Sequence, residues 1–113
     1  MTTVVLSKTY LGSVSPEDLS FAEEMLDKFL HTMEREELRP STICLYTDGV
    51  KLACENSPTL LGLELLEGLG VEILLCGSCV ERFQLEDSLR VGKVCTMKDI
   101  VEALSKSDRV LYP

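Results

Sequence analysis

The sequence predicts an α/β fold in which five parallel strands form one sheet and helices cover its faces. Short β-branched and apolar runs alternate along the chain with amphipathic segments, the pattern of parallel strands joined by helical crossovers. Two of the expected helices begin with the same serine–proline pair. The 113 residues suffice for one compact core and leave no room for a second, so we expect a single domain over residues 1–113.

The first strand and the longest helix are expected in the N-terminal third. Residues 4–6 form a short apolar run typical of a buried strand. Ser15 and Pro16 then predict a helix start, with the serine as N-cap and the proline in the first turn. Apolar residues follow at spacings of three and four and should face the core as one stripe. They are Ala22, Met25, Leu26, Phe29, Leu30 and Met33.

The middle of the chain repeats this order. Residues 42–46 predict a second buried strand, which runs into a turn at residues 47–49. The serine–proline pair at residues 57–58 predicts a second helix, and Gly68 and Gly70 are expected to end it with a left-handed cap. The residues of this helix expected to face the core are Leu61, Leu65 and Leu69.

The remaining elements are shorter. They are a third strand over residues 71–75, a short helix or turn over 85–89, a fourth strand over 91–95, a helix after the capping pattern at 96–99 and a last strand over 109–112. In such sheets functional residues gather at the carboxyl ends of the strands, where helix N-termini present free N–H groups. The segment that follows the third strand lies at such an end.

Composition excludes several classes of partner. The chain has 19 acidic and 11 basic residues and a formal charge of −8, so we expect no binding to nucleic acid. Its longest apolar stretch, residues 60–75, is interrupted by glutamates and too short to span a bilayer, so we expect no membrane association. The N-terminus does not resemble a signal peptide, so we expect a cytoplasmic protein with five free thiols.

Cys76-Gly-Ser-Cys79 is the one motif that combines reactive atoms with a meaningful spacing. Two thiols three residues apart at a strand-to-helix corner can approach each other. Gly77 and Ser78 lie between them, and the backbone N–H groups of this loop are expected to stabilise a thiolate and depress its pKa. A depressed pKa is what a nucleophile or persulfide carrier needs at neutral pH. Cys95 ends the fourth strand and is a candidate third thiol, beside the alternative that it packs in the core.

Other chemistries find little support. A zinc site needs four soft ligands, and the chain offers one such cysteine pair and a single histidine, His31, so no metal is expected. No cofactor is expected either, because the chain has no glycine-rich phosphate loop. Lys51 and Arg82 lie near strand ends and could attract an anionic sulfur species. Cys44 is expected in the core, and the pattern leaves the position of Cys54 open.

Three segments carry a resemblance to a known family: LYTDGVKLACENS at residues 45–57, GVEILLCGSC at 70–79 and VGKVCTM at 91–97. The sequence resembles the DsrE-like family, and is most similar to the C-terminal domain of YedF-type selenium-metabolism proteins, described as sulfurtransferase-like. The resemblance implies a three-layer α/β/α sandwich of the DsrE/YchN type with a five-stranded parallel sheet, often assembled as a homo-oligomer. It also implies that sulfur is carried as a cysteine persulfide after the third strand, at Cys76 or Cys79.

The sequence departs from the family pattern in two places, one that concerns a partner protein and one that concerns the shape of a loop. YedF-type chains carry an N-terminal TusA-like domain with its own Cys-Pro motif. This sequence begins at the first DsrE-like strand, so we expect a TusA-like sulfur carrier to act in trans. Relatives often have a glycine shortly after the second cysteine, where this chain has VERFQ at residues 80–84, so we expect a loop of different shape there.

The sequence thus predicts a sulfurtransferase-like carrier of sulfur or selenium that forms a persulfide in the Cys76–Cys79 segment. Two other functions stay open. Cys-Gly-Ser-Cys is also a redox-type sequence, so the protein could be a dithiol/disulfide oxidoreductase. Alternatively, the chain is a non-enzymatic, oligomeric binding module whose cysteines only pack.

Overall fold

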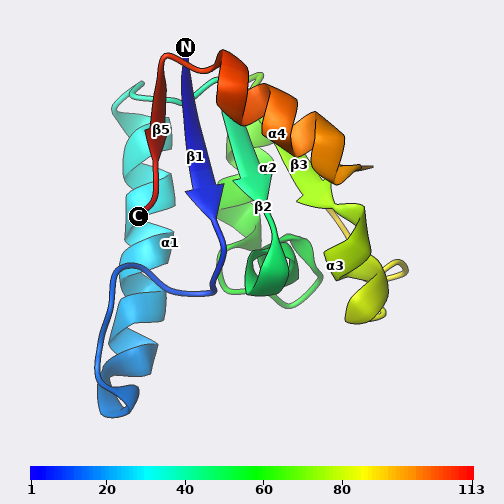
Figure 1. Cartoon of the computed structure of the whole chain (residues 1–113). Coiled ribbons are helices and arrows are strands. Elements are labelled where there is room, and N and C mark those ends of the chain that lie inside the picture. The colour runs from blue at the N-terminus through cyan, green and yellow to red at the C-terminus, as the bar shows by residue number, and fades with distance from the viewer.

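The computed structural model describes all 113 residues and contains one parallel sheet of five strands (Figure 1). The strands are β1 (Thr2–Leu6), β2 (Thr42–Leu45), β3 (Glu72–Cys76), β4 (Lys93–Cys95) and β5 (Arg109–Leu111). Their order across the sheet is β4-β3-β2-β1-β5, so the two three-residue strands form the edges. The predicted α/β fold with a five-stranded parallel sheet is confirmed.

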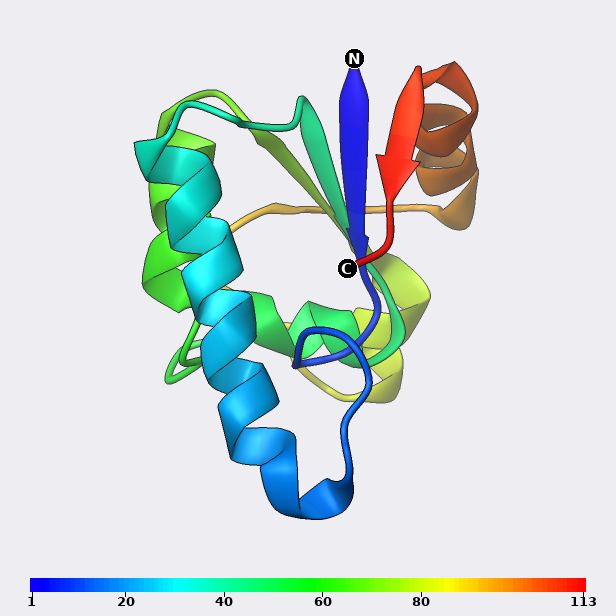
Figure 2. The same ribbon diagram turned by 90° about the vertical axis from the view of Figure 1, so that its left-hand side faces the viewer.

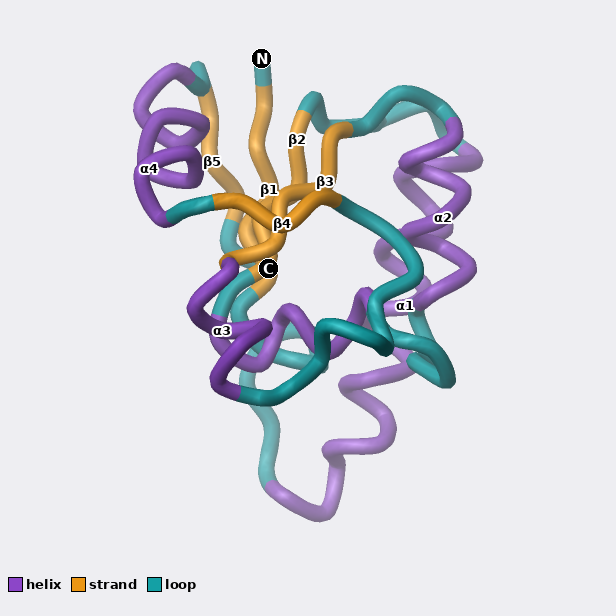
Figure 3. The backbone as a smooth tube through the Cα atoms, turned by 90° about the vertical axis from the view of Figure 1, so that its right-hand side faces the viewer, coloured by secondary structure: helices purple, strands orange, loops and turns teal.

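Helices cover both faces of this sheet. The helices α1 (Leu19–Arg35) and α2 (Leu60–Gly68) pack together on one face, and α4 (Met97–Lys106) covers part of the other (Figure 2). The short helix α3 (Gly77–Arg82) and the 3-10 helix η2 (Thr47–Ala53) lie beyond the carboxyl ends of the strands (Figures 1 and 3). The arrangement is the three-layer α/β/α sandwich that the sequence resemblance implies.

The apolar core lies mainly between the sheet and the α1–α2 layer. Thr3 faces the opposite layer, because its hydroxyl contacts that of Ser107 at the end of α4. Side chains alternate along a strand, so the neighbouring residue Val4 faces α1 and α2. Its register partners, Ile43 in β2 and Ile73 in β3, face the same way. These strand residues and the α1 leucines at positions 26 and 30 are fully buried. The face toward α4 therefore holds the more polar side chains of the sheet.

The buried face of α2 differs from the prediction. The expected core residues are on the outer side of the helix, 60%, 38% and 50% exposed: Leu61, Leu65 and Leu69. The residues that face the core are Gly62, Leu63 and Leu66. Gly62 allows α2 to approach α1, because a Cβ there would lie 3.3 Å from the Cβ of Leu30. Leucines surround this helix, so their spacing alone does not identify the side that packs.

Helix starts also differ from the prediction. Ser15 makes no side-chain cap, and Pro16–Asp18 forms a separate 3-10 turn before α1. The helix α2 begins after Thr59, whose N–H donates to the hydroxyl of Ser57 at 3.3 Å. The hydroxyl of Ser57 thus bonds within the turn before α2 instead of capping the helix. The capping pattern at residues 96–99 is confirmed, since Thr96 and Asp99 bond each other's backbone N–H at the start of α4.

Candidate functional site

The predicted thiol pair lies at the carboxyl end of β3. Cys76 is the last residue of this strand and is 1% exposed, whereas Cys79 is half-buried in the first turn of α3. Gly77 lies against β4, where a Cβ would be 3.1 Å from the carbonyl oxygen of Cys95. Ser78 is exposed. The second cysteine of the pair is therefore the more accessible one.

The sheet brings two further thiols toward this pair. Cys95 ends β4 and is in register with Cys76 on the neighbouring strand. Side chains in register on parallel strands share a face, and alternation assigns Cys44 of β2 to the same face. This is the face of Thr3, toward α4. The structure thus gathers three strand cysteines on one side of the sheet, with the α3 thiol beside them.

Cys54 is apart from this group. It follows η2, is 7% exposed, and its thiol donates to the carbonyl oxygen of Val50 at 3.7 Å. An isolated bridge also joins its backbone to Leu89. Cys54 is therefore a core residue of the loop layer.

Thr47 is a residue of the candidate site that was not predicted from the sequence. Its backbone N–H donates to the Sγ of Cys79 at 3.1 Å. Its φ of +48° is in the left-handed region, which is unusual for a β-branched residue. Its hydroxyl donates to the carbonyl oxygens of Ser7 and Tyr46, at 2.8 and 2.7 Å, and these bonds hold it there. The turn predicted at residues 47–49 was the only sequence signal for it.

The pKa of Cys79 moves in the direction opposite to the prediction. Burial raises it most, and a hydrogen bond with Cys76 raises it further, while the N–H of Thr47 lowers it without reversing the effect. The pKa of Cys95 is also raised, by burial and by the nearby charge of Asp99. At Cys79 the backbone N–H of Thr47 thus does not produce an acidic thiol in the resting protein. The expectation of a depressed pKa is wrong, because loss of hydration outweighs one backbone donor.

The reactivity of Cys79 should therefore increase steadily with pH. We expect the rate of its alkylation by iodoacetamide to rise from neutral pH to beyond 9.0, since only the thiolate reacts and the pKa lies above that value. Mass spectrometry of the peptide that carries Cys79 measures the rate, and Cys79→Ser gives the background from other thiols. A rate that levels off near neutral pH would show that the thiol is acidic and would contradict this expectation.

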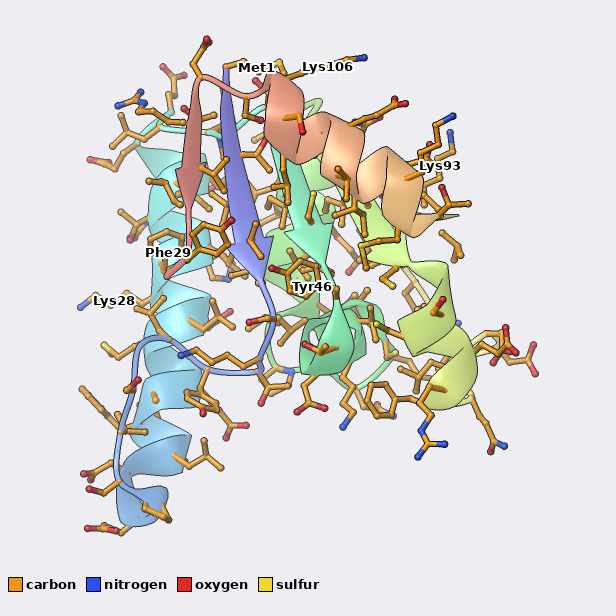
Figure 4. All side chains as sticks on the ribbon, in the orientation of Figure 1. Met1, Lys28, Phe29, Tyr46, Lys93 and Lys106 are labelled. Atoms are coloured by element: carbon orange, nitrogen blue, oxygen red, sulfur yellow. The ribbon has the colours of Figure 1, made fainter.

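Tyr46 and Lys51 flank the site. Tyr46 lies two residues after Cys44, and its side chain lies at the carboxyl end of β2 (Figure 4). Burial, then the neighbouring Tyr112 and Cys44, raise the pKa of its phenol, so it stays a neutral hydrogen-bonding group. Lys51 pairs with Asp48 at 2.8 Å and lies 4.4 Å from the ring centroid of Phe83. Its charge is thus largely committed to partners within the protein.

The cysteines and the single histidine are not arranged as a disulfide or a metal site. All five cysteines are free, and no group of three or more His, Cys, Asp or Glu side chains is arranged to hold a metal ion. His31, the only histidine, lies 3.4 Å from the carboxylate of Asp27 one turn earlier in α1. None of the helices combines the length and the apolar character needed to cross a bilayer.

Comparison with known proteins gives matches at the level of family and fold. The DsrE/DsrF-like family matches residues 20–113. The YchN protein from E. coli has a similar structure, with a TM-score of 0.68 and 16% identity, over 99% of this chain and 97% of that one. A conserved protein of unknown function from Bacteroides thetaiotaomicron gives 0.65 and 17%, over 99% and 93%. A search of curated proteins found no match.

Proposed function

Because the chain belongs to the DsrE/DsrF-like family, we propose that it is a sulfurtransferase-like carrier of sulfur or selenium. In this proposal the cargo is held as a persulfide in the Cys76-Gly-Ser-Cys79 segment. The observation that carries it is the pairing of the two thiols, with the half-buried Cys79 Sγ accepting the N–H of Thr47 at 3.1 Å. Within the family we propose a specific relationship to the C-terminal domain of YedF-type proteins, on the strength of the three sequence segments described above.

Exposure favours Cys79 as the thiol that accepts sulfur. Its thiolate attacks the outer sulfur of a donor persulfide, so that a new S–S bond forms at Cys79 as the donor S–S bond breaks and the donor leaves as a thiolate. The Thr47 N–H is positioned to stabilise negative charge on Cys79 Sγ before attack and again when the cargo departs. The raised pKa of Cys79 keeps the empty carrier protonated, which limits its reaction with other electrophiles.

The persulfide can be released by two routes, of which the second uses Cys76. A thiolate of an acceptor protein can take the outer sulfur directly, which regenerates the Cys79 thiolate. Alternatively, Cys76 attacks the inner sulfur, which releases hydrosulfide and leaves a Cys76–Cys79 disulfide that an external dithiol must reduce. The proximity of the two thiols, three residues apart at the junction of β3 and α3, supports this second route. The same proximity favours dithiol/disulfide exchange as the second candidate function, for which reduction of insulin disulfides is the assay.

Partners and compartment complete the proposal. We propose a TusA-like protein as donor or acceptor in trans, and a homo-oligomer as the functional form. Free thiols at all five cysteines suit a reducing compartment, and we propose the cytoplasm.

Loading with inorganic polysulfide tests the carrier function. Intact-protein mass spectrometry should show the gain of one sulfur atom in the wild type. Cys79→Ser should lose it, because the accepting nucleophile is absent. Cys76→Ser should keep it, with a longer lifetime, because the resolving thiol is absent. Cys54→Ala is the matched control and should load normally, since that thiol lies away from the site.

The same experiment can refute the proposal. If none of these proteins gains sulfur, the chain is not a persulfide carrier. If Cys79→Ser loads and Cys76→Ser does not, the accepting thiol is Cys76 and the assignment above is wrong. Loading with inorganic polyselenide in place of polysulfide asks whether selenium is a cargo: the Cys79 thiolate would attack a terminal selenium, an Se–Se bond would break, and the protein would gain one selenium atom.

A further inference from the structure

Cys79, Cys76 and Cys95 form a row of neighbouring thiols. The thiol of Cys79, in the first turn of α3, lies beside that of Cys76 at the end of β3, close enough for Cys76 to raise its pKa. Cys76 and Cys95 are register partners on adjacent parallel strands, which lie about 4.8 Å apart. The two groups also interact electrostatically, because charge on Cys76 contributes to the raised pKa of Cys95. Cys76 is thus the middle member, and it is the only one of the three that is almost fully inaccessible to solvent.

The two ends of the row face different surroundings. Cys79 lies against η2, where the N–H of Thr47 donates to its sulfur. Cys95 lines two cavities, one on either side of β4. The first, of about 400 Å³, runs beneath α4 from Lys93 to Met1 and Lys106 (Figure 4). The second, of about 510 Å³, lies between β4 and α3. Cys79 lines neither of these cavities.

The second cavity beside Cys95 is acidic, whereas the first is mixed, because the N-terminal residue Met1 and two lysines line it together with three acidic residues. The carboxylates that line them are those of Glu72, Asp99 and Glu102 in the first and Glu81 and Glu86 in the second. Lys93 and Lys106 are the only lysines or arginines in either lining. A thiol of a second protein that reaches Cys95 through the second cavity would therefore be favoured by basic residues around it.

We propose that Cys95 is the exit thiol of an internal sulfur relay that runs from Cys79 through Cys76 to Cys95. The inference rests on the proposed carrier function and adds a direction to it. Sulfur enters on the η2 side and leaves from the cavities beside β4. The acceptor is a protein thiol surrounded by basic residues.

Each relay step balances without an external reagent. Cys76 attacks the outer sulfur of the Cys79 persulfide, so one S–S bond forms as another breaks, and the proton of Cys76 passes to the departing Cys79 thiolate. Cys95 then attacks the outer sulfur at Cys76 in the same manner, and its proton returns to Cys76. The sulfur keeps its oxidation state throughout, so no oxidant or reductant is consumed.

Time-resolved location of the persulfide tests the relay. The protein is loaded with limiting polysulfide, quenched by alkylation at successive times, digested and analysed by mass spectrometry. In the wild type the extra sulfur should appear first on Cys79 and later on Cys95. In Cys76→Ser it should stay on Cys79 and fail to reach Cys95. In Cys95→Ser, loading of Cys79 should be unchanged, while transfer to a basic thiol peptide should slow at least several-fold.

The outcomes separate the relay from the carrier function. Persulfide that loads on Cys79 and never appears on Cys95 overturns the relay and leaves the carrier function intact. Cys95 loading that is equally fast in Cys76→Ser and wild type shows direct loading and also overturns the relay. Absence of persulfide on every cysteine overturns the carrier function itself. Cys44→Ala is the control, because this thiol shares the face but is not a member of the row.

Discussion

Gly49→Ala is expected to lower the free energy of unfolding by about 3 kcal/mol or more, at the upper end of what overpacking costs. A Cβ at this position would lie 1.9 Å from the carbonyl oxygen of Leu6 and 2.7 Å from its carbonyl carbon. Both are backbone atoms at the end of β1, so neither can move without displacing the strand. Urea unfolding at neutral pH, followed by circular dichroism, measures the difference from wild type.

Gly68→Ala is the matched control. Gly68 is the last residue of α2, and a Cβ there meets no atom within 4 Å. Alanine has the higher helix propensity, so this variant should be as stable as the wild type or slightly more stable. If both variants unfolded at the same urea concentration, η2 would not be packed against β1 as described. The position of Thr47, which η2 carries, would then be in doubt as well.

The protein is expected to lose stability as the pH rises from 9.0 to about 11, with Cys44 as the largest single contributor. Burial, with smaller effects from Cys95 and Glu72, raises the pKa of Cys44 from 9.0 to about 11. The folded state thus holds this proton more tightly than the unfolded chain does. The resulting stabilisation is fully present below pH 9.0 and is lost as the pH rises through about 11. A pKa difference of this size corresponds to about 3 kcal/mol.

Cys44→Ala separates this titration from other alkaline effects. The variant should be less stable than the wild type at neutral pH, because it leaves a cavity in β2. Its unfolding free energy should nevertheless decline less between pH 9.0 and about 11. Some decline should remain, because the pKa values of Cys54, Cys79 and Cys95 are raised too. A decline as steep as in wild type would show that Cys44 does not carry this stabilisation.

Apolar runs were sufficient to predict the fold class and the number of strands. Each strand is a short apolar segment between turn residues, and that feature is local. Strand ends were less predictable, because backbone pairing determines them. Val71 and Val91 are both 4% exposed, yet β3 and β4 begin only after them. The packed side of α2 was not predictable, since it depends on where Gly62 lets α1 approach.

The thiol pair was predictable from spacing, and the approach of Cys95 from the expected strand order. Two features were not. Thr47 acts through its backbone N–H, which every non-proline residue possesses, so its residue type carries no signal for this role. The direction in which the pKa of Cys79 shifts from its ordinary value depends on how much water η2, α3 and β3 exclude from the sulfur. That quantity exists only after the chain has folded.

The edge position of β4 has a dynamic consequence for Cys95. This strand has three residues and hydrogen-bonds to a single neighbour, and Val94 at its centre is 50% exposed. Short edge strands of this kind open locally, and the free energy of this opening is much smaller than the free energy of global unfolding. Cys76, on a central strand, is not free to follow such motion. Local opening of this edge strand therefore widens the access to the Cys95 sulfur that the two cavities beside it already provide.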